Sequence, residues 1–256
     1  MVRPRAPEFV PRMLAAAARV FARTGLKQAR MTDIAREMGV AHGSLYNYVE
    51  SKEALFLLLV EQWGRPGLNL DGRELPLRTP SMANIVERLR RRVHDTLPLP
   101  ALDAALKRRK AGNTKEELRA IVLELFLQTE RSRDGATILE RSARDVPELF
   151  GLFFEQVRRD LFARLTRYVA IRMQDGAFHS ADPPTTARFI VESVTFFARH
   201  RFLDPYPQEL DDDVVRQTVV DLITRSLVSA TYQAVSNPAA TRSRQRRKCS
   251  SNTSSP

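Results

Sequence analysis

Small, polar and aromatic side chains follow one another between positions 41 and 52 of the chain. A helix that lies in the major groove of DNA needs small residues near the groove floor and hydrogen-bonding groups against the base edges. It also needs hydroxyl or cationic groups at the phosphate walls. We therefore expect a nucleic-acid interface in this segment. The residues expected to form it are Ala41, His42, Gly43, Ser44, Tyr46, Asn47, Tyr48 and Lys52, joined by Arg30 and Thr32 just upstream.

Three short helices with almost no loop between them are the elements that must position these side chains. Apolar residues recur at helical spacing over 31–38, Gly39 then breaks the pattern, and Leu45 and Val49 resume it four residues apart. Ser51 is a good N-cap for a third helix. Two helices joined through a glycine turn make a helix-turn-helix, whose second helix fits the major groove.

The orientation of the second helix follows from its apolar positions. If Leu45 points to the core, a rotation of about 100° per residue places Gly43 and Asn47 on the opposite face. Lys52 begins the next helix, where a cation and free backbone N–H groups together suit a phosphate. The alternative is that these polar residues form an ordinary solvated surface of a small packing module.

The segment GVAHGSLYNYVESKEALF closely resembles the recognition segment of the TetR family of bacterial transcription regulators. Upstream, Phe21 and Gly25 also stand where that family's first helix has them, so the resemblance spans about residues 9–63. Two positions depart from the pattern: Arg30 replaces the usual Thr or Ser, and Val49 replaces a common Phe. The matching residues are Ile34, Ala35, Gly39, Val40, Gly43, Leu45, Tyr46, Tyr48, Ser51, Lys52, Glu53 and Leu55.

The net charge of +11 suits a nucleic-acid partner, but the excess is not concentrated in this segment. Residues 1–63 hold nine Lys and Arg against six Asp and Glu, a net of +3, whereas residues 237–256 hold five basic and no acidic residues. We expect residues 1–8 to form a basic arm and residues 236–256 a disordered basic tail. The tail is either merely solvated or an auxiliary phosphate-binding arm.

Cysteine, histidine and apolar patterns exclude several classes of protein. Cys249 is the single cysteine, so no intrachain disulfide forms, and the four histidines lack ligand spacing. No apolar run of about twenty residues and no signal sequence are present. We expect a cytoplasmic protein without metal, cofactor or membrane contact. The sequence also lacks GxSxG, HExxH, P-loop and dinucleotide motifs, which argues against an enzyme.

The remainder of the chain reads as helices, so the expected fold class is all-α. Residues 64–80 are rich in Gly, Pro and Asp and indicate a linker, and residues 81–235 form a second, helical domain after the DNA-binding domain at 9–63. Ser81 is expected to cap the first of these helices, Thr114 with Glu117 to form a capping box, and Gly176 to close a long helix. The expected helices are 81–97, 101–111, 114–132, 134–145, 147–174, 184–201 and 212–234.

The last two helices carry apolar stripes wider than one core-facing side requires. Two such helices from each of two chains would close a four-helix interface, which is how the TetR family dimerises. The alternative is that the stripes are core of a monomer. The residues expected at the dimer interface are Phe189, Val194, Phe197, Val215, Val219, Leu222, Ile223 and Leu227.

A homodimer would place two recognition helices on a palindromic operator, about one DNA turn (~34–36 Å) or more apart. The resemblance implies a repressor that a small-molecule effector releases by favouring a state with lower DNA affinity. Aromatic residues of the middle helices would suit an apolar effector, although such residues are more often core. They are Phe126, Phe150, Phe153, Phe154, Phe162 and Met173. The alternatives are an activator, or a DNA-binding architectural protein without an effector.

Overall fold

The computed structural model describes residues 8–63, 70, 73–96, 98–108, 112–206 and 208–229. Most of the expected basic arm, part of the expected linker and the whole expected tail lie outside these residues. Over the described residues the chain is helical and contains no strand, only two isolated β-bridges, which confirms the all-α fold class. No helix among the described residues is long and apolar enough to cross a membrane.

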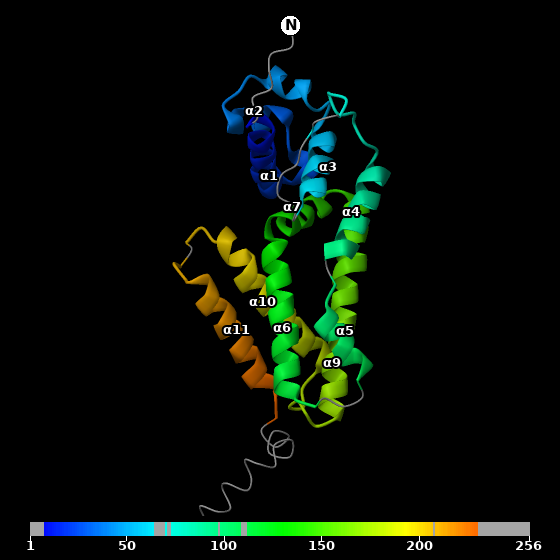
Figure 1. The fold of residues 1–256 in the computed structure, drawn as a ribbon, viewed down its shortest axis with the longest axis vertical. Helices are drawn as coiled ribbons and strands as arrows, with labels where there is room; N and C mark the ends of the chain where they lie inside the picture. The colour runs from blue at the N-terminus through cyan, green and yellow to red at the C-terminus, as the bar shows by residue number, and fades with distance from the viewer. Residues whose placement is uncertain are drawn as a thin grey trace, which may run out of the picture. The chain divides into compact units, whose positions relative to one another are not determined.

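The chain divides into two compact units (Figure 1). The first contains residues 1–98 and 128–161, and the second contains residues 99–127 and 162–256. Each unit is thus built from two separate stretches of sequence. The domain bounds expected from the sequence, 9–63 and 81–235, remain predictions.

The first unit collects the N-terminal helices and three later elements. Its helices are α1 (Phe9–Gln28), α2 (Met31–Met38), the 3-10 helix η1 (His42–Asn47), α3 (Lys52–Gln62), α4 (Met82–Thr96), α7 (Arg133–Ala143), α8 (Pro147–Phe150) and the π-helix η2 (Gly151–Arg158). The core forms where α1 packs on α2, α3 and α7. Phe21 and Phe56 meet edge to face inside it, with ring centroids 5.4 Å apart.

Hydroxyl caps begin two helices of this unit as the sequence predicts. Ser51 Oγ accepts a hydrogen bond from the N–H of Ala54 at the start of α3, and Ser81 Oγ accepts one from Asn84 at the start of α4. In the described part of the expected linker, Leu77 exchanges backbone hydrogen bonds with Tyr48 and Glu50, both 2.9 Å long. This pairing fixes the chain segment beside the end of η1.

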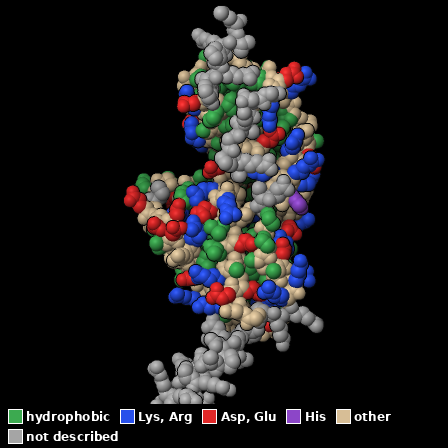
Figure 2. All heavy atoms as spheres, in the orientation of Figure 1, with side chains coloured by type: hydrophobic (Ala, Val, Ile, Leu, Met, Phe, Trp, Pro, Cys, Tyr) green, Lys and Arg blue, Asp and Glu red, His purple; other side chains and the backbone are tan. Residues whose placement is uncertain are grey.

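The second unit contains α5 (Pro100–Lys107), α6 (Thr114–Arg131), α9 (Arg159–Gln174), α10 (Pro183–Ala198), the 3-10 helix η3 (His200–Leu203) and α11 (Asp212–Leu227), with one end of α6 and of α9 in the first unit. Helices α10 and α11 lie side by side in Figure 1. An ion pair between Arg119 and Asp221 joins α6 to α11. Figure 2 shows acidic side chains gathered where α10 and α11 are connected.

A buried ionic cluster lies among α5, α6 and α9. Arg172 is fully buried and donates to both carboxylate oxygens of Glu117, at 2.7 and 3.3 Å. It also donates to Asp175 at 3.2 Å and to the carbonyl of Ala105 at 3.1 Å. Burial, and next the charge of Glu117, hold the pKa of neighbouring Tyr168 well above its usual value. These bonds compensate for burying the guanidinium, because an unpaired buried charge is costly.

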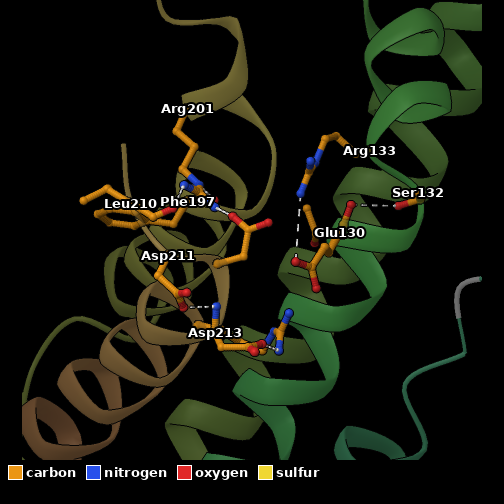
Figure 3. A network of polar contacts seen from close by, with 11 residues as sticks. Glu130, Ser132, Arg133, Phe197, Arg201, Leu210, Asp211 and Asp213 are labelled. Atoms are coloured by element: carbon orange, nitrogen blue, oxygen red, sulfur yellow. Dashed lines mark hydrogen bonds and ion pairs between the residues drawn. The ribbon is translucent and has the colours of Figure 1, made fainter. Parts of the chain in front are cut away.

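Arg201 bonds to residues on both sides of the connection between α10 and α11 (Figure 3). Its guanidinium donates to the carbonyl of Phe197 at 2.7 Å and to the carbonyl of Leu210, and it pairs with Asp212. Asp211 Oδ1 caps α11 by accepting hydrogen bonds from the backbone N–H groups of Asp213 and Val214, at 3.0 and 2.9 Å. The acidic start of α11 therefore caps a helix, as its favourable interaction with the helix dipole predicts.

Several expected helix bounds were wrong. The capping box at Thr114 does not form, because Asn113 Oδ1 accepts the N–H of Glu116 while Glu117 turns to Arg172. Helix α11 ends at Leu227, because Val228 is extended and bridges to Phe178. The long helix expected at 147–174 is present as the contiguous elements α8, η2 and α9, with η2 as a π-helical segment, and its expected end near Gly176 is confirmed. The helix expected at 184–201 ends at Ala198 and is followed by η3.

Candidate nucleic-acid interface

The expected recognition segment is a single 3-10 helix, η1, held by the turn that follows α2. Gly39 makes that turn with φ +68°, a left-handed conformation that favours glycine, and its N–H bonds back to the carbonyls of Ala35 and Arg36. Leu45 is fully buried and anchors η1 to the core. The buried side chain of Leu45 and the turn at Gly39 therefore fix the orientation of η1.

Most of the predicted base-reading residues share one open face. The exposed residues are Ala41, His42, Gly43, Tyr46 and Asn47, and Ser44 is half-buried. His42 and Tyr46 meet edge to face with ring centroids 5.0 Å apart, and the Tyr46 hydroxyl lies 3.3 Å from His42 Nε2. This contact orients two hydrogen-bonding groups on the face expected to meet base edges and phosphates.

Tyr48 does not lie on that face, contrary to the sequence prediction. Only 8% of it is exposed, and its ring stacks on Phe9 with centroids 4.6 Å apart. Tyr48 directly follows η1 and lies three residues after Leu45, a spacing that places two residues near one face of a 3-10 helix and of an α-helix alike. Tyr48 is therefore buried on the side of Leu45.

The side chain of Lys52 forms hydrogen bonds within the protein. Its Nζ donates to the carbonyl of Lys27 at 2.8 Å and to that of Ala29 at 3.1 Å, at the end of α1. The ammonium group has three donors, so one is left for a phosphate. Lys52 therefore fastens α3 to α1, and its contact with DNA remains a prediction.

Arg30 and Thr32 are both exposed at the start of α2. Arg30 occupies the N-cap position in extended conformation and makes no side-chain capping bond, so the hydroxyl cap of the resembled family is absent. The free N–H groups of a helix start and a cationic side chain both favour a phosphate. This arrangement supports the predicted phosphate contacts at α2.

The opposite side of α2 carries an ion-pair cluster that neutralises an acidic residue. Glu37 accepts hydrogen bonds from Arg23 and Arg19, both at 2.8 Å. The hydrogen bond from Arg23, and next that from Arg19, hold the pKa of Glu37 below its usual value. The carboxylate thus stays ionised and couples α2 to α1.

Two residues that support the interface have no recognisable signal in the sequence. Arg12 in α1 donates to the carbonyl of Met38 at 3.0 Å, at the end of α2, and Phe9 supplies the ring on which Tyr48 stacks. An arginine near the start of a helix looks like any solvated cation in a sequence. Only the fold shows that it bonds a carbonyl beside the turn.

The aromatic residues predicted to line an effector pocket are divided between the two units. In the first unit, Phe150, Phe153 and Phe154 contact one another, and Phe150 is exposed. In the second unit, Phe126 is buried, while Phe162 and Met173 are half-buried. A cavity of about 480 Å³ is present within the first unit, and none of these six residues lines it.

The predicted dimer residues likewise separate into two groups. Phe189 and Leu222 are 51% and 63% exposed, and Phe197 is half-buried. The other five are in the core of their own chain, because α10 and α11 pack closely within the second unit. These buried residues are Val194, Val215, Val219, Ile223 and Leu227. Their contact with a partner chain stays a prediction.

No group of three or more metal-ligating side chains is gathered anywhere in the described part of the chain. The arrangement at η1 and α2 supplies hydrogen-bond donors, acceptors and cations on an exposed surface. Such a surface is suited to binding the groove and backbone of a duplex.

Comparison with known proteins agrees with this geometry. The sequence model of the family described as "Bacterial regulatory proteins, tetR family" matches residues 13–59, which run from α1 to α3. No curated protein matches the chain. A tetR-family regulatory protein from Rhodococcus RHA1 is 20% identical, covering 88% of this chain and 100% of its own, with a TM-score of 0.52.

A second solved structure gives the same fold. The ketosteroid transcriptional regulator KstR2 of Mycobacterium tuberculosis is 18% identical, covering 90% of this chain and 100% of its own, with a TM-score of 0.52. At these identities the structural likeness shows the fold alone. Residues 13–59 therefore match the N-terminal, DNA-binding domain that is described for bacterial regulatory proteins of the tetR family.

Proposed function

We propose that the chain is a homodimeric repressor that binds a palindromic operator in the cytoplasm and is released by a small, mainly apolar molecule. The observation that carries the proposal is the open face of η1, where His42, Tyr46 and Asn47 are presented beside the exposed start of α2. One such short helix covers only a few base pairs. Two of them, related by a two-fold axis, would read a palindrome of useful length.

Exposed apolar side chains on α10 and α11 support the dimer. Phe189 and Phe196 lie seven residues apart on α10, and Val214 and Leu222 lie eight apart on α11, with 46% to 63% of each exposed. Seven or eight residues are about two helical turns, so each pair occupies one face of its helix. Exposed apolar stripes on adjacent helices favour a self-complementary contact across a two-fold axis.

A charge placed in that stripe tests the dimer. Phe189→Arg and Leu222→Arg should each convert the dimer to monomers in sedimentation velocity, because an unpaired cation would be buried at the interface. Phe150→Arg is the matched control, since Phe150 is 44% exposed in the first unit and should leave the dimer intact. A wild-type chain that sediments as a monomer at micromolar concentration would contradict the proposal.

The same variants separate dimerisation from DNA binding. Wild-type protein should place two protomers on each operator duplex, and the monomeric variants should bind it far more weakly, because both half-sites must be held at once. Equal affinity of the monomeric variants and the wild type would mean that one chain suffices. The operator would then not be read as a palindrome by a dimer.

A further inference from the structure

Helices α1 and α7 approach each other very closely at their C-terminal ends. A Cβ at Gly25 would lie 3.1 Å from the carbonyl oxygen of Arg141, and the φ of Gly25 is +74°, so glycine is required there. The backbone N–H of Leu26 donates to Ser142 Oγ at 3.0 Å, and Arg141 Nε donates to the carbonyl of Arg23 at 3.2 Å. This end of the helix pair is therefore fixed.

Toward their N-terminal ends the same two helices line a cavity. Its volume is about 480 Å³, within the range usual for sites that bind small organic molecules. Helix α1 contributes Ala15 and Ala18, α3 contributes Phe56, α4 contributes Leu89 and α7 contributes Ile138. Trp63, the residue that follows α3, also lines the cavity. Two of these walls, α1 and α3, belong to the DNA-binding domain.

Trp63 fits at the cavity wall because the residue that faces its ring, Gly135, has no side chain. A Cβ at Gly135 of α7 would come within 1.3 Å of the indole ring, so the ring lies directly on the glycine backbone. Trp63 is also the chain's single tryptophan. The tryptophan fluorescence of the chain therefore comes from a residue at the wall of this cavity.

The polar residues that line the cavity define the head group of a ligand. Arg131, Asp134 and Gln62 line it, and Arg131 and Asp134 are exposed. No described residue forms a hydrogen bond or ion pair with Arg131, so its guanidinium is available to an anion or acceptor. Asp134 adds one negative charge to the same rim and disfavours a multiply charged head group.

We propose that this cavity binds a small molecule with an apolar body and a single anionic head group, and that the bound molecule lowers DNA affinity. Because α1 and α7 are fixed at one end, a molecule inserted at the other acts as a wedge that shifts α1 and α3 away from α7. The regulatory half of the inference rests on the proposed repressor function. The binding half stands on the cavity itself.

The probe for the binding half is 1-anilinonaphthalene-8-sulfonate, which has an apolar body and one sulfonate. Titrated into the full chain without DNA, it should quench Trp63 saturably by energy transfer, with one site per chain. Ala15→Phe should abolish this quenching by filling the cavity. Ala163→Phe, at an exposed position of α9 that does not line the cavity, should bind as the wild type does. Equal quenching in both variants, or none in the wild type, would overturn the site.

A second variant keeps the test decisive if Ala15→Phe fails to fold, which circular dichroism would reveal. Arg131→Gln changes an exposed side chain and should weaken the probe about fivefold, through loss of one charge-assisted contact at the rim. An unchanged dissociation constant would overturn the assigned head-group contact.

The regulatory half is tested separately on a DNA duplex that the wild type binds. The probe should lower the DNA affinity of the wild type and of Ala163→Phe, and leave that of Ala15→Phe unchanged. Saturable Trp63 quenching without any loss of DNA affinity would contradict the proposed shift of α1 and α3, while the proposed binding site would stand. If the chain recognised no specific duplex, the proposed repressor function would fail while the fluorescence result stood.

Discussion

The hydroxyl of Ser142, near the end of α7, accepts a hydrogen bond from the backbone N–H of Leu26, 116 residues earlier in the chain. The same hydroxyl donates to the carbonyl of Ile138 at 2.7 Å, and Ser142 is fully buried. One side chain thus satisfies a buried donor of the DNA-binding domain and a carbonyl of α7. This neutral hydroxyl thus joins α1 to α7, beside the hydrogen bond from Arg141 to the carbonyl of Arg23.

Ser142→Ala should lower the free energy of unfolding by about 1–3 kcal/mol, because the N–H of Leu26 would stay buried without an acceptor. Chemical denaturation followed by circular dichroism measures this change. Ser226→Ala is the matched control, since that exposed hydroxyl only bonds back to the carbonyl of Ile223 and its loss should change stability by less than about 0.5 kcal/mol. Equal losses would show that the Leu26 contact is unimportant.

Gly135→Ala should displace the Trp63 indole from the backbone of α7. The expected cost is about 1–3 kcal/mol of stability, as for other insertions into packed regions, with a red shift of tryptophan emission. Gly151→Ala is the control within a helix, because a Cβ there meets only Glu155 Oε2 at 3.6 Å. Unchanged emission in Gly135→Ala would contradict the observed contact.

Tyr46 and Lys52 should differ in what their removal changes. Tyr46→Ala removes an exposed side chain and should weaken binding to many DNA sequences while stability stays within about 0.5 kcal/mol of wild type. Lys52→Ala should weaken DNA binding and also cost about 1 kcal/mol of stability, because it releases the carbonyls of Lys27 and Ala29. Thermal melts and fluorescence anisotropy separate these effects, and an unaltered affinity of Tyr46→Ala would mean that η1 is misassigned.

Asn47→Ala should alter base preference more than general affinity. Asn47 is exposed on η1, and a side-chain amide that pairs with a base edge contributes about 1–3 kcal/mol of discrimination. Competition between the preferred duplex and single-base variants measures it. A uniform loss across all duplexes would instead assign Asn47 to the phosphate backbone.

Arg172→Met should cost about 3–5 kcal/mol, because Glu117 and Asp175 would lose the cation that compensates their burial. Adding Glu117→Gln to this variant should recover part of the loss, since an amide is less costly to bury than a carboxylate. A double variant no more stable than Arg172→Met alone would show that Glu117 is solvated well enough without its partner. Denaturant titration of the three proteins decides between these outcomes.

The sequence was sufficient for the all-α fold and for the order of the N-terminal helices. Gly39 marked a turn that needs positive φ, and Ser51 and Ser81 marked helix starts by hydroxyl chemistry. These signals are local, so they survive without knowledge of the tertiary structure. The family resemblance rested on the same residues and is confirmed over 13–59.

The errors arose where long-range contacts overrode local patterns. The burial of Tyr48 depends on its contact with Phe9, nearly forty residues away in the sequence. The early end of α11 depends on the pairing of Val228 with Phe178. Periodicity likewise could not separate buried from exposed apolar residues on α10 and α11, because both faces are apolar at the same spacing.

The contacts of the cavity left no local signal either. Gly135 and Trp63 are 72 positions apart, and Ser142 resembles any helical serine until it is seen beside Leu26. Glu117 fitted a capping box by its spacing, but a buried arginine from α9 competes for it. The roles of these residues depend on contacts with residues that are distant in the sequence.

Selection of bound duplexes from a random DNA pool, with the full chain at physiological salt, tests the central claim most directly. We predict an enriched palindrome whose half-sites are about one DNA turn (~34–36 Å) or more apart. The contradicting result is the absence of any enriched motif, with binding that vanishes when residues 237–256 are removed. The basic C-terminal segment would then carry the affinity, and η1 would not be the reader of the operator.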